Sequence, residues 1–138
     1  MIALFDTDVV LDLFLDRQPF AEAAAQMFSK VEVGEIQGYV SATTITTVYY
    51  LTTKTIGIRK AKWATRKLLS LLKVASVDQS VIEGALEGKY KDFEDGVIAE
   101  AARQIRANFI VTRNVRDFKT SPVPAHSAAE TLKLLKAV

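Results

Sequence analysis

The acidic residues that could do chemistry begin at the start of the chain. Asp6 and Asp8 directly follow Ile2–Phe5, an unbroken apolar run that predicts a strand buried on both faces. Apolar residues at 9–14 then recur at helical spacing. Acids at the carboxyl end of a buried strand are costly unless a positive group offsets them, and a divalent cation is the simplest candidate. The alternative is that Thr7 or Asp8 caps the helix, which leaves Asp6 unexplained.

A second acidic cluster comprises Asp92, Glu94 and Asp95, just ahead of a helical pattern over residues 97–105. Asp92 and Asp95 are three positions apart, so at a helix start their side chains lie on one face, about 5–6 Å apart. Helix N-termini favour negative charge, and a cap at Asp92 with an acid at the third position explains the same residues. From these residues alone, a cap and a metal site stay open.

Polar residues also follow another buried strand, predicted over residues 109–112. Asn114 and Asp117 come after it, within a basic segment. Taken alone, Asp117 also fits a turn residue or an ion-pair partner. Because the carboxyl ends of parallel strands gather at one edge, we expect Asp6, Asp95 and the 114–117 segment to meet. Such an arrangement holds Mg²⁺ or Mn²⁺ and leaves positions for water and phosphate.

The elements that position these acids alternate along the chain. The patterns predict strands at 2–5, 38–42, 74–77 and 109–112, with an edge strand after Pro124, and helices at 19–33, 43–55, 59–72, 78–87, 97–105 and 127–135. This alternation predicts an α/β fold with a mostly parallel sheet. With 138 residues, we expect one domain over 1–138.

Composition excludes several classes of protein. There is no cysteine, so disulfides and thiolate metal sites are not available, and this fits a cytoplasmic protein. The sequence contains no membrane-spanning run, and acids interrupt the N-terminal apolar segment, which argues against a signal peptide. A net charge of +2 does not indicate nucleic acid by itself.

The three acidic segments together carry a family resemblance. Residues 5–12 (FDTDVVLD), 92–95 (DFED) and 111–118 (VTRNVRDF) resemble the motifs of PIN domains, and in particular the single-domain VapC-type toxin ribonucleases. The resemblance implies a three-layer α/β/α fold and metal-dependent cleavage of RNA. On that pattern Asp6 is the first metal ligand and Asp95 the acid of the helix before the fourth strand. The last acidic position falls on Asn114 or Asp117, and the choice between them stays open.

One position departs from the family pattern. Many PIN nucleases carry a glutamate early in the helix after the second strand, where this chain has Thr47. Asp92 and Asp8 are the candidates to replace it. The resemblance also implies a small antitoxin as partner, and a homodimer.

The predicted function is therefore that of a divalent-metal-dependent endoribonuclease, the toxin of a type II toxin–antitoxin pair. Asp6, Asp92, Asp95 and Asp117 form its catalytic and metal-binding set, with Mg²⁺ or Mn²⁺ as cofactor. Further ligands, or residues that bond the phosphate or a metal-bound water, are Thr7, Asp8, Thr112 and Asn114. The cations expected to bind the RNA backbone are Lys89, Lys91, Arg113 and Arg116.

Two alternatives remain at this stage. The Thr47 departure allows a PIN domain with weakened catalysis that acts as an RNA- or protein-binding module. Asp6-Thr7-Asp8 also resembles the start of haloacid-dehalogenase-like phosphatases, where Asp6 would be the nucleophile and Asp8 the acid and base. The chain is short for that class, and no convincing catalytic lysine precedes Asp92.

Overall fold

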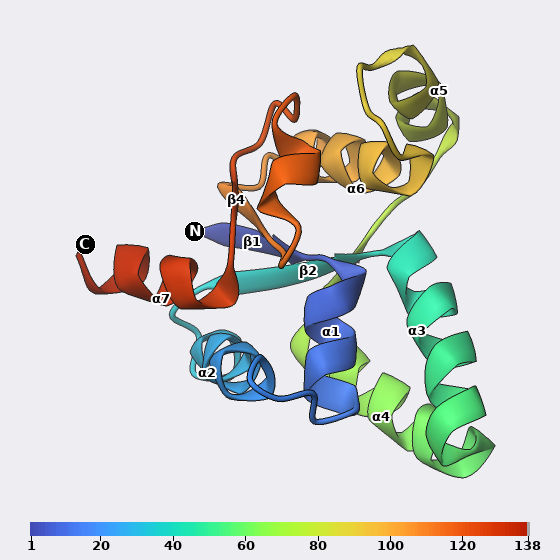
Figure 1. Ribbon diagram of the computed structural model, residues 1–138, viewed down its shortest axis with the longest axis vertical. Coiled ribbons are helices and arrows are strands. Elements are labelled where there is room, and N and C mark those ends of the chain that lie inside the picture. Colours follow the sequence, from blue (N-terminus) through green and yellow to red (C-terminus); the bar gives the residue numbers. More distant parts are fainter. Residues whose placement is uncertain (138) are drawn as a thin grey trace.

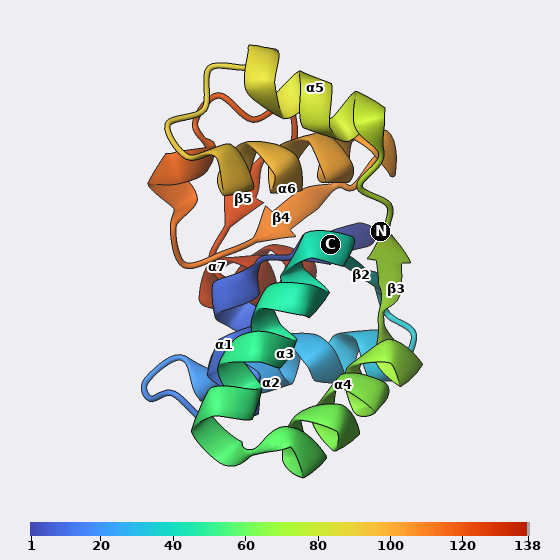
Figure 2. The same cartoon turned by 90° about the vertical axis from the view of Figure 1, so that its right-hand side faces the viewer.

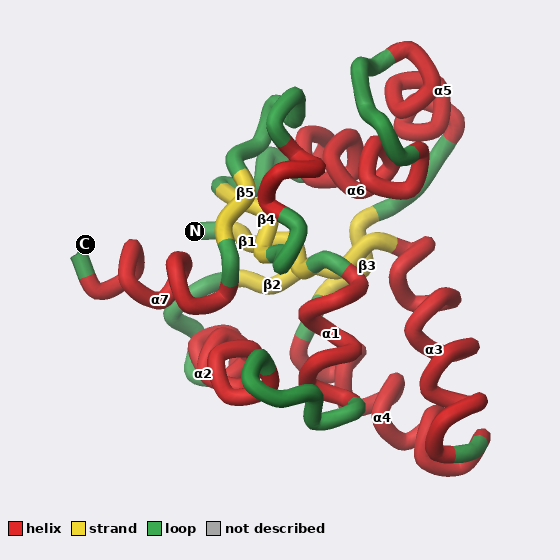
Figure 3. Tube along the Cα trace, viewed as in Figure 1, coloured by secondary structure: helices red, strands yellow, loops and turns green. Residues whose placement is uncertain are grey.

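The computed structural model describes residues 1–137, which form a five-stranded sheet in the order β3-β2-β1-β4-β5 (Figures 1 and 3). Every pairing is parallel. The strands are β1 (Ile2–Phe5), β2 (Gln37–Ser41), β3 (Lys73–Ala75), β4 (Phe109–Val111) and β5 (Ala125–His126). The sheet predicted as mostly parallel is thus parallel throughout, and the α/β prediction is confirmed.

Helices cover both faces of this sheet. They are α1 (Thr7–Phe14), α2 (Ala21–Glu32), α3 (Ala42–Ile56), α4 (Ile58–Leu71), α5 (Gln79–Glu87), α6 (Phe93–Gln104) and α7 (Ala128–Lys136), with a short 3₁₀ helix η1 (Val115–Phe118). Figures 1 and 2 show α5 and α6 on one face, and α1 to α4 with α7 on the other. The result is the three-layer α/β/α arrangement that the family resemblance implied.

The central strand shows why the sheet has two cores. Along β1, Ala3 and Phe5 pack into the apolar cluster under α1, α2 and α3, whereas Leu4 packs into the cluster under α5 and α6. All three side chains are fully buried. An unbroken apolar run is what a strand covered on both faces requires.

The layout brings the carboxyl ends of the strands to one edge. There β1 leads into α1, β2 into α3, and β4 into η1. Local capping signals fix several helix starts as predicted: Asp78 accepts from the Val81 N–H, and Ser127 forms a reciprocal capping box with Glu130. No helix within residues 1–137 is both long and apolar enough to span a membrane.

Candidate metal-binding and RNA-binding site

Asp6 lies at the junction of β1 and α1 and is itself the helix cap. Its Oδ1 accepts a hydrogen bond from the Thr7 N–H over 2.7 Å. The expectation that Thr7 or Asp8 would cap this helix is therefore wrong, because the chain enters the helix one residue earlier. The same carboxylate is 5% exposed, so Asp6 is both a structural cap and a buried charge at the sheet edge.

The other oxygen of Asp6 accepts a hydrogen bond from the residue that follows β4. The fully buried Thr112 donates its hydroxyl to Asp6 Oδ2 over 2.7 Å and accepts from the Asn114 N–H. Burial, reinforced by the Asp8 carboxylate, raises the pKa of Asp6 to about 7, and the bonds from Thr112 and Thr7 oppose this rise. A nearby cation would therefore stabilise the ionised form of Asp6.

Asp8 is fixed by the loop after β4. Its Oδ2 accepts from the Arg113 N–H over 3.1 Å and from the Asn114 side-chain amide over 3.2 Å. Its Oδ1 is buried and has no partner within the described chain. Burial raises the pKa of Asp8 as well. An orphaned carboxylate oxygen beside Asp6 is an available ligand position.

Asp95 projects from the first turn of α6 and carries the second strongly shifted pKa. Burial raises the pKa of Asp95 to about 6, and the charges of Asp92, Asp117, Asp8 and Glu94 add to the rise. Asp92 caps the helix, since its Oδ1 accepts from the Glu94 and Asp95 N–H groups. The capping interpretation of Asp92 is confirmed; a ligand role for it stays a prediction.

Asp6, Asp8, Asp95 and Asn114 surround one open pocket of about 190 Å³, here called the acid pocket, whereas Asp92 and Thr112 are not among its lining residues. Its lining consists of Asp6, Thr7, Asp8, Leu11, Arg17, Glu94, Asp95, Ile98 and Asn114. The donors are carboxylate, amide and hydroxyl oxygens, which suit Mg²⁺ or Mn²⁺. Within residues 1–137 no three acidic or imidazole groups stand close enough to hold an ion unaided. Water or phosphate oxygens would complete the shell, as is usual for Mg²⁺.

Next to the acid pocket lies a second pocket of about 350 Å³, here called the basic pocket. It is lined by Lys89, Lys91, Arg116, Asp117, Lys119 and Thr120. Three of the four cations predicted to bind RNA therefore meet in one place. Asp117 is exposed and lies among them rather than in the acid pocket, whereas Asn114 lines the acid pocket. The charge of Asp117 still reaches Asp95.

Arg113, the fourth predicted RNA-binding cation, has partners within the protein. Its Nε donates to Asp12 Oδ2 over 2.9 Å, and its guanidinium lies 4.2 Å from the centroid of the Phe20 ring. The structure thus engages this side chain in packing α1 against the loop after β4. Its proposed contact with RNA stays a prediction.

Thr47 lines a third pocket, which adjoins the acid pocket and holds about 300 Å³. On α3, Thr44 approaches α1, and its hydroxyl lies 3.0 Å from that of Thr7. No carboxylate from α3 reaches the acid pocket. The departure at Thr47 therefore leaves this side of the site with hydroxyl groups.

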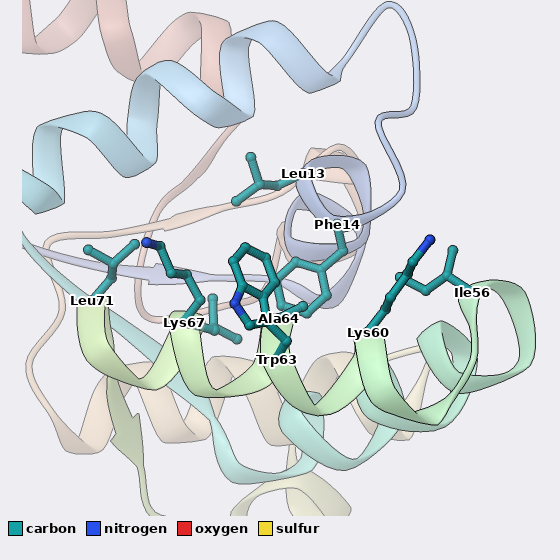
Figure 4. Close-up of a pocket in the computed structure, with 9 residues that line it drawn as sticks. Leu13, Phe14, Ile56, Lys60, Trp63, Ala64, Lys67 and Leu71 are labelled. Carbon is teal, nitrogen blue, oxygen red and sulfur yellow. The ribbon is translucent and has the colours of Figure 1, made fainter.

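A further pocket, of about 440 Å³, lies at the far end of α1 from the acids. Trp63 rises from α4 toward Phe14 of α1, with Lys60 and Lys67 on either side of it (Figure 4). We call this the apolar groove. Trp63 is 67% exposed, so a core role for it is excluded. An exposed tryptophan in an apolar groove is typical of a protein-binding surface.

Two ionisable residues that line the acid pocket, Glu94 and Arg17, were not predicted as site residues from the sequence. Glu94 was recognised as part of the acidic cluster, but only its position in the first turn of α6 shows that its side chain lines the pocket. Arg17 lies in the loop between α1 and α2, and nothing in its local sequence relates it to Asp6.

Comparison with known proteins gives the family of the chain. A family model described as PIN domain matches residues 3–116. No curated protein sequence matches. Among solved structures, a toxin–antitoxin complex from Klebsiella pneumoniae is 28% identical, with a TM-score of 0.69, and the alignment covers 91% of this chain and 97% of that one.

Two further structures share the fold at lower identity. VapBC-1 from nontypeable Haemophilus influenzae is 17% identical with a TM-score of 0.72, covering 94% of this chain and 99% of that one. VapC20 from Mycobacterium tuberculosis, a toxin that cleaves the sarcin–ricin loop, is 15% identical with a TM-score of 0.64, covering 78% and 86%. With the family model matching most of its length, the chain belongs to the PIN domain family.

Proposed function

We propose that this protein is a divalent-metal-dependent endoribonuclease and the toxin of a type II toxin–antitoxin pair. The observation that carries the proposal is the acid pocket, where two carboxyls have pKa values raised to about 7 and about 6 beside a pocket of lysines and arginine. A bound metal ion stabilises carboxylates that repel one another, and lysine and arginine side chains beside them attract the phosphate backbone of RNA. The similarity to toxin structures adds support.

In this proposal each residue has a defined task. A bound Mg²⁺ or Mn²⁺ would stabilise charge on the scissile phosphate and lower the pKa of the attacking water. Asp6 and Asp95 would hold the ion, with Asp8 Oδ1 as a further ligand. Thr112 and Asn114 keep Asp6 and Asp8 in place through the hydrogen bonds described above. Lys91 and Arg116 would bind neighbouring RNA phosphates.

The partner we propose is a small antitoxin. The apolar groove offers Trp63, Leu13 and Phe14 for an apolar helix face, and α4 carries five cations and no acid. An amphipathic partner helix with an acidic flank suits this surface. We further propose that residues 1–138 form one domain, and that the protein acts as a homodimer in the cytoplasm.

The test is incubation with mixed RNAs in Mg²⁺, in Mn²⁺ and in chelator. The proposal expects fragments with metal and none in chelator. Equal cleavage in chelator would exclude the metal mechanism. Absence of cleavage under all conditions, with RNA still bound, would favour the alternative that the Thr47 departure has left an RNA-binding module. Release of inorganic phosphate from small phosphate esters would instead support the phosphatase alternative.

A further inference from the structure

The pocket that contains Thr47, here called the threonine pocket, is continuous with the acid pocket. The two share Thr7, Glu94 and Ile98 in their linings. A group bound in one therefore adjoins a group bound in the other. The basic pocket shares no lining residue with the acid pocket, and the charge of its Asp117 acts on Asp95. The acid pocket thus has two neighbours of different chemistry.

The chemistry of the threonine pocket differs from that of the basic pocket. Five threonines from α1 and α3 line it; the hydroxyls of Thr7, Thr43, Thr44 and Thr46 are hydrogen-bonded within the protein, and that of Thr47 has no hydrogen-bond partner among the described residues. Helices α5 and α6 contribute apolar side chains and the Phe93 ring, which is 45% exposed. Glu94 is the only ionisable side chain in this lining, so the pocket offers no cation to a phosphate. A neutral ligand with hydrogen-bonding edges and a flat face fits it better.

We propose that the threonine pocket binds one nucleoside of the RNA substrate, the one next to the phosphate held in the acid pocket. Phe93 provides a surface for base stacking, which tolerates any base because every base has a π-face. The Thr47 hydroxyl can both donate and accept, as the ribose 2′-hydroxyl does. A volume of about 300 Å³ is at the small end of ligand pockets, which suits a single nucleoside.

This inference rests on the proposed function and gives the RNA a direction across the site. The basic pocket would take phosphates and the threonine pocket a nucleoside, with the acid pocket linked to both. In this arrangement Thr47 contributes a hydroxyl to substrate binding at the position where many relatives carry a glutamate. A carboxylate there would place a second negative charge beside Glu94 in the same pocket.

The direct test uses nucleosides that carry no phosphate, so that neither metal nor cleavage is needed. Adenosine, guanosine, cytidine and uridine are titrated in chelator into the full chain, with NMR signals observed from the threonine and isoleucine methyls. We expect concentration-dependent shifts at Thr47, Ile82 and Ile98, smaller for the 2′-deoxynucleosides. Shifts confined to the apolar groove, or none in the threonine pocket, would overturn the proposal.

The second test measures RNA cleavage by variants. Phe93→Leu and Thr47→Val should raise the KM for RNA by about tenfold and about threefold, respectively, with melting temperatures near that of wild type. Tyr50→Leu and Thr55→Val are matched controls, since both residues are exposed on α3 outside this pocket. An unchanged KM in both test variants would sink the nucleoside site while the nuclease stands. If RNA is never cleaved, the proposed function fails, and the nucleoside shifts still decide this inference.

Discussion

Arg113 Nε donates to Asp12 Oδ2 over 2.9 Å, and Asp12 is 1% exposed. The backbone N–H of the same arginine bonds to Asp8. Arg113, in the loop after β4, therefore contacts α1 at Asp8 and at Asp12, which are four residues apart on one helix face. This double contact positions Asp8 beside Asp6.

Loss of the arginine should destabilise the protein in a pH-dependent way. Burial raises the pKa of Asp12, and Arg113 opposes the rise. Arg113→Ala removes this opposition, so the folded-state pKa moves further above the unfolded value. The free energy of unfolding then falls as pH rises from the unfolded-state pKa of Asp12 through its folded-state pKa. We expect a loss of about 1–3 kcal/mol at pH 7, moderated because Arg113 is partly exposed, and less at pH 5.

The measurement for Arg113→Ala is urea unfolding at pH 5 and pH 7. Arg59→Ala serves as the control, because Arg59 is an exposed cation on α4. If Arg113→Ala were as stable as the control at both pH values, Asp12 would not depend on its partner.

Metal-free wild-type protein should become less stable as pH rises. The raised pKa values of Asp6 and Asp95, about 7 and about 6, lie above the unfolded value, so the native state binds more protons than the unfolded state between about pH 5 and pH 7. Stability falls with pH in that window. Melting temperatures in chelator at half-unit steps test this. A melting temperature that rises throughout the window would contradict the shifts.

The hydroxyl of Thr112 should matter more than its methyl group. Thr112→Val leaves Asp6 Oδ2 buried without a donor, which we expect to cost about 1–3 kcal/mol and to raise the pKa of Asp6 further. Thr112→Ser keeps the hydroxyl and should lose less. Unfolding free energies of the two variants at pH 7 provide the comparison, and equal losses would assign the effect to packing.

The basic pocket should determine the salt dependence of RNA binding. Lys91→Ala and Arg116→Ala should each weaken binding and reduce the salt slope by about one. The control is Lys73→Ala, because Lys73 is an exposed cation on the edge strand β3, on the opposite side of β1 from β4, and it lines neither the acid pocket nor the basic pocket. Filter binding in chelator over a range of salt measures the slope. A salt slope equal to that of the control would show that the basic pocket does not bind RNA phosphates.

The fold was predictable because its signals are local. Ile2–Phe5 shows a doubly covered strand within four residues, and Ser127 with Glu130 specifies a helix start. Alternation of such segments is sufficient for a parallel α/β fold, and the family motifs supplied the layer arrangement. The capping alternative named Thr7 or Asp8, whereas the cap is Asp6, because the sequence alone does not fix where a strand ends.

The site was only partly predictable, because its contacts join distant residues. Thr112 and Asp6 are 106 positions apart. Arg113 appears in sequence as one cation among several, and only the fold places it against Asp12. Asp117 and Asn114 differ by three positions, yet η1 carries Asp117 into the basic pocket and leaves Asn114 in the acid pocket.

The central claim is that Asp6 helps to hold a divalent cation, and Asp6→Asn tests it most directly. Asparagine can still cap α1 through its Oδ1, and its amide nitrogen can donate to the Thr112 hydroxyl in place of the bond that Asp6 Oδ2 accepts, so the variant removes charge while keeping a contact on each side. In chelator at pH 7.5 it should melt no lower than wild type. Mn²⁺ should then raise the melting temperature of wild type by mass action, and that of the variant much less, with RNA cleavage lost. A variant that melts lower in chelator and responds to Mn²⁺ as wild type does would contradict the metal site and the nuclease mechanism.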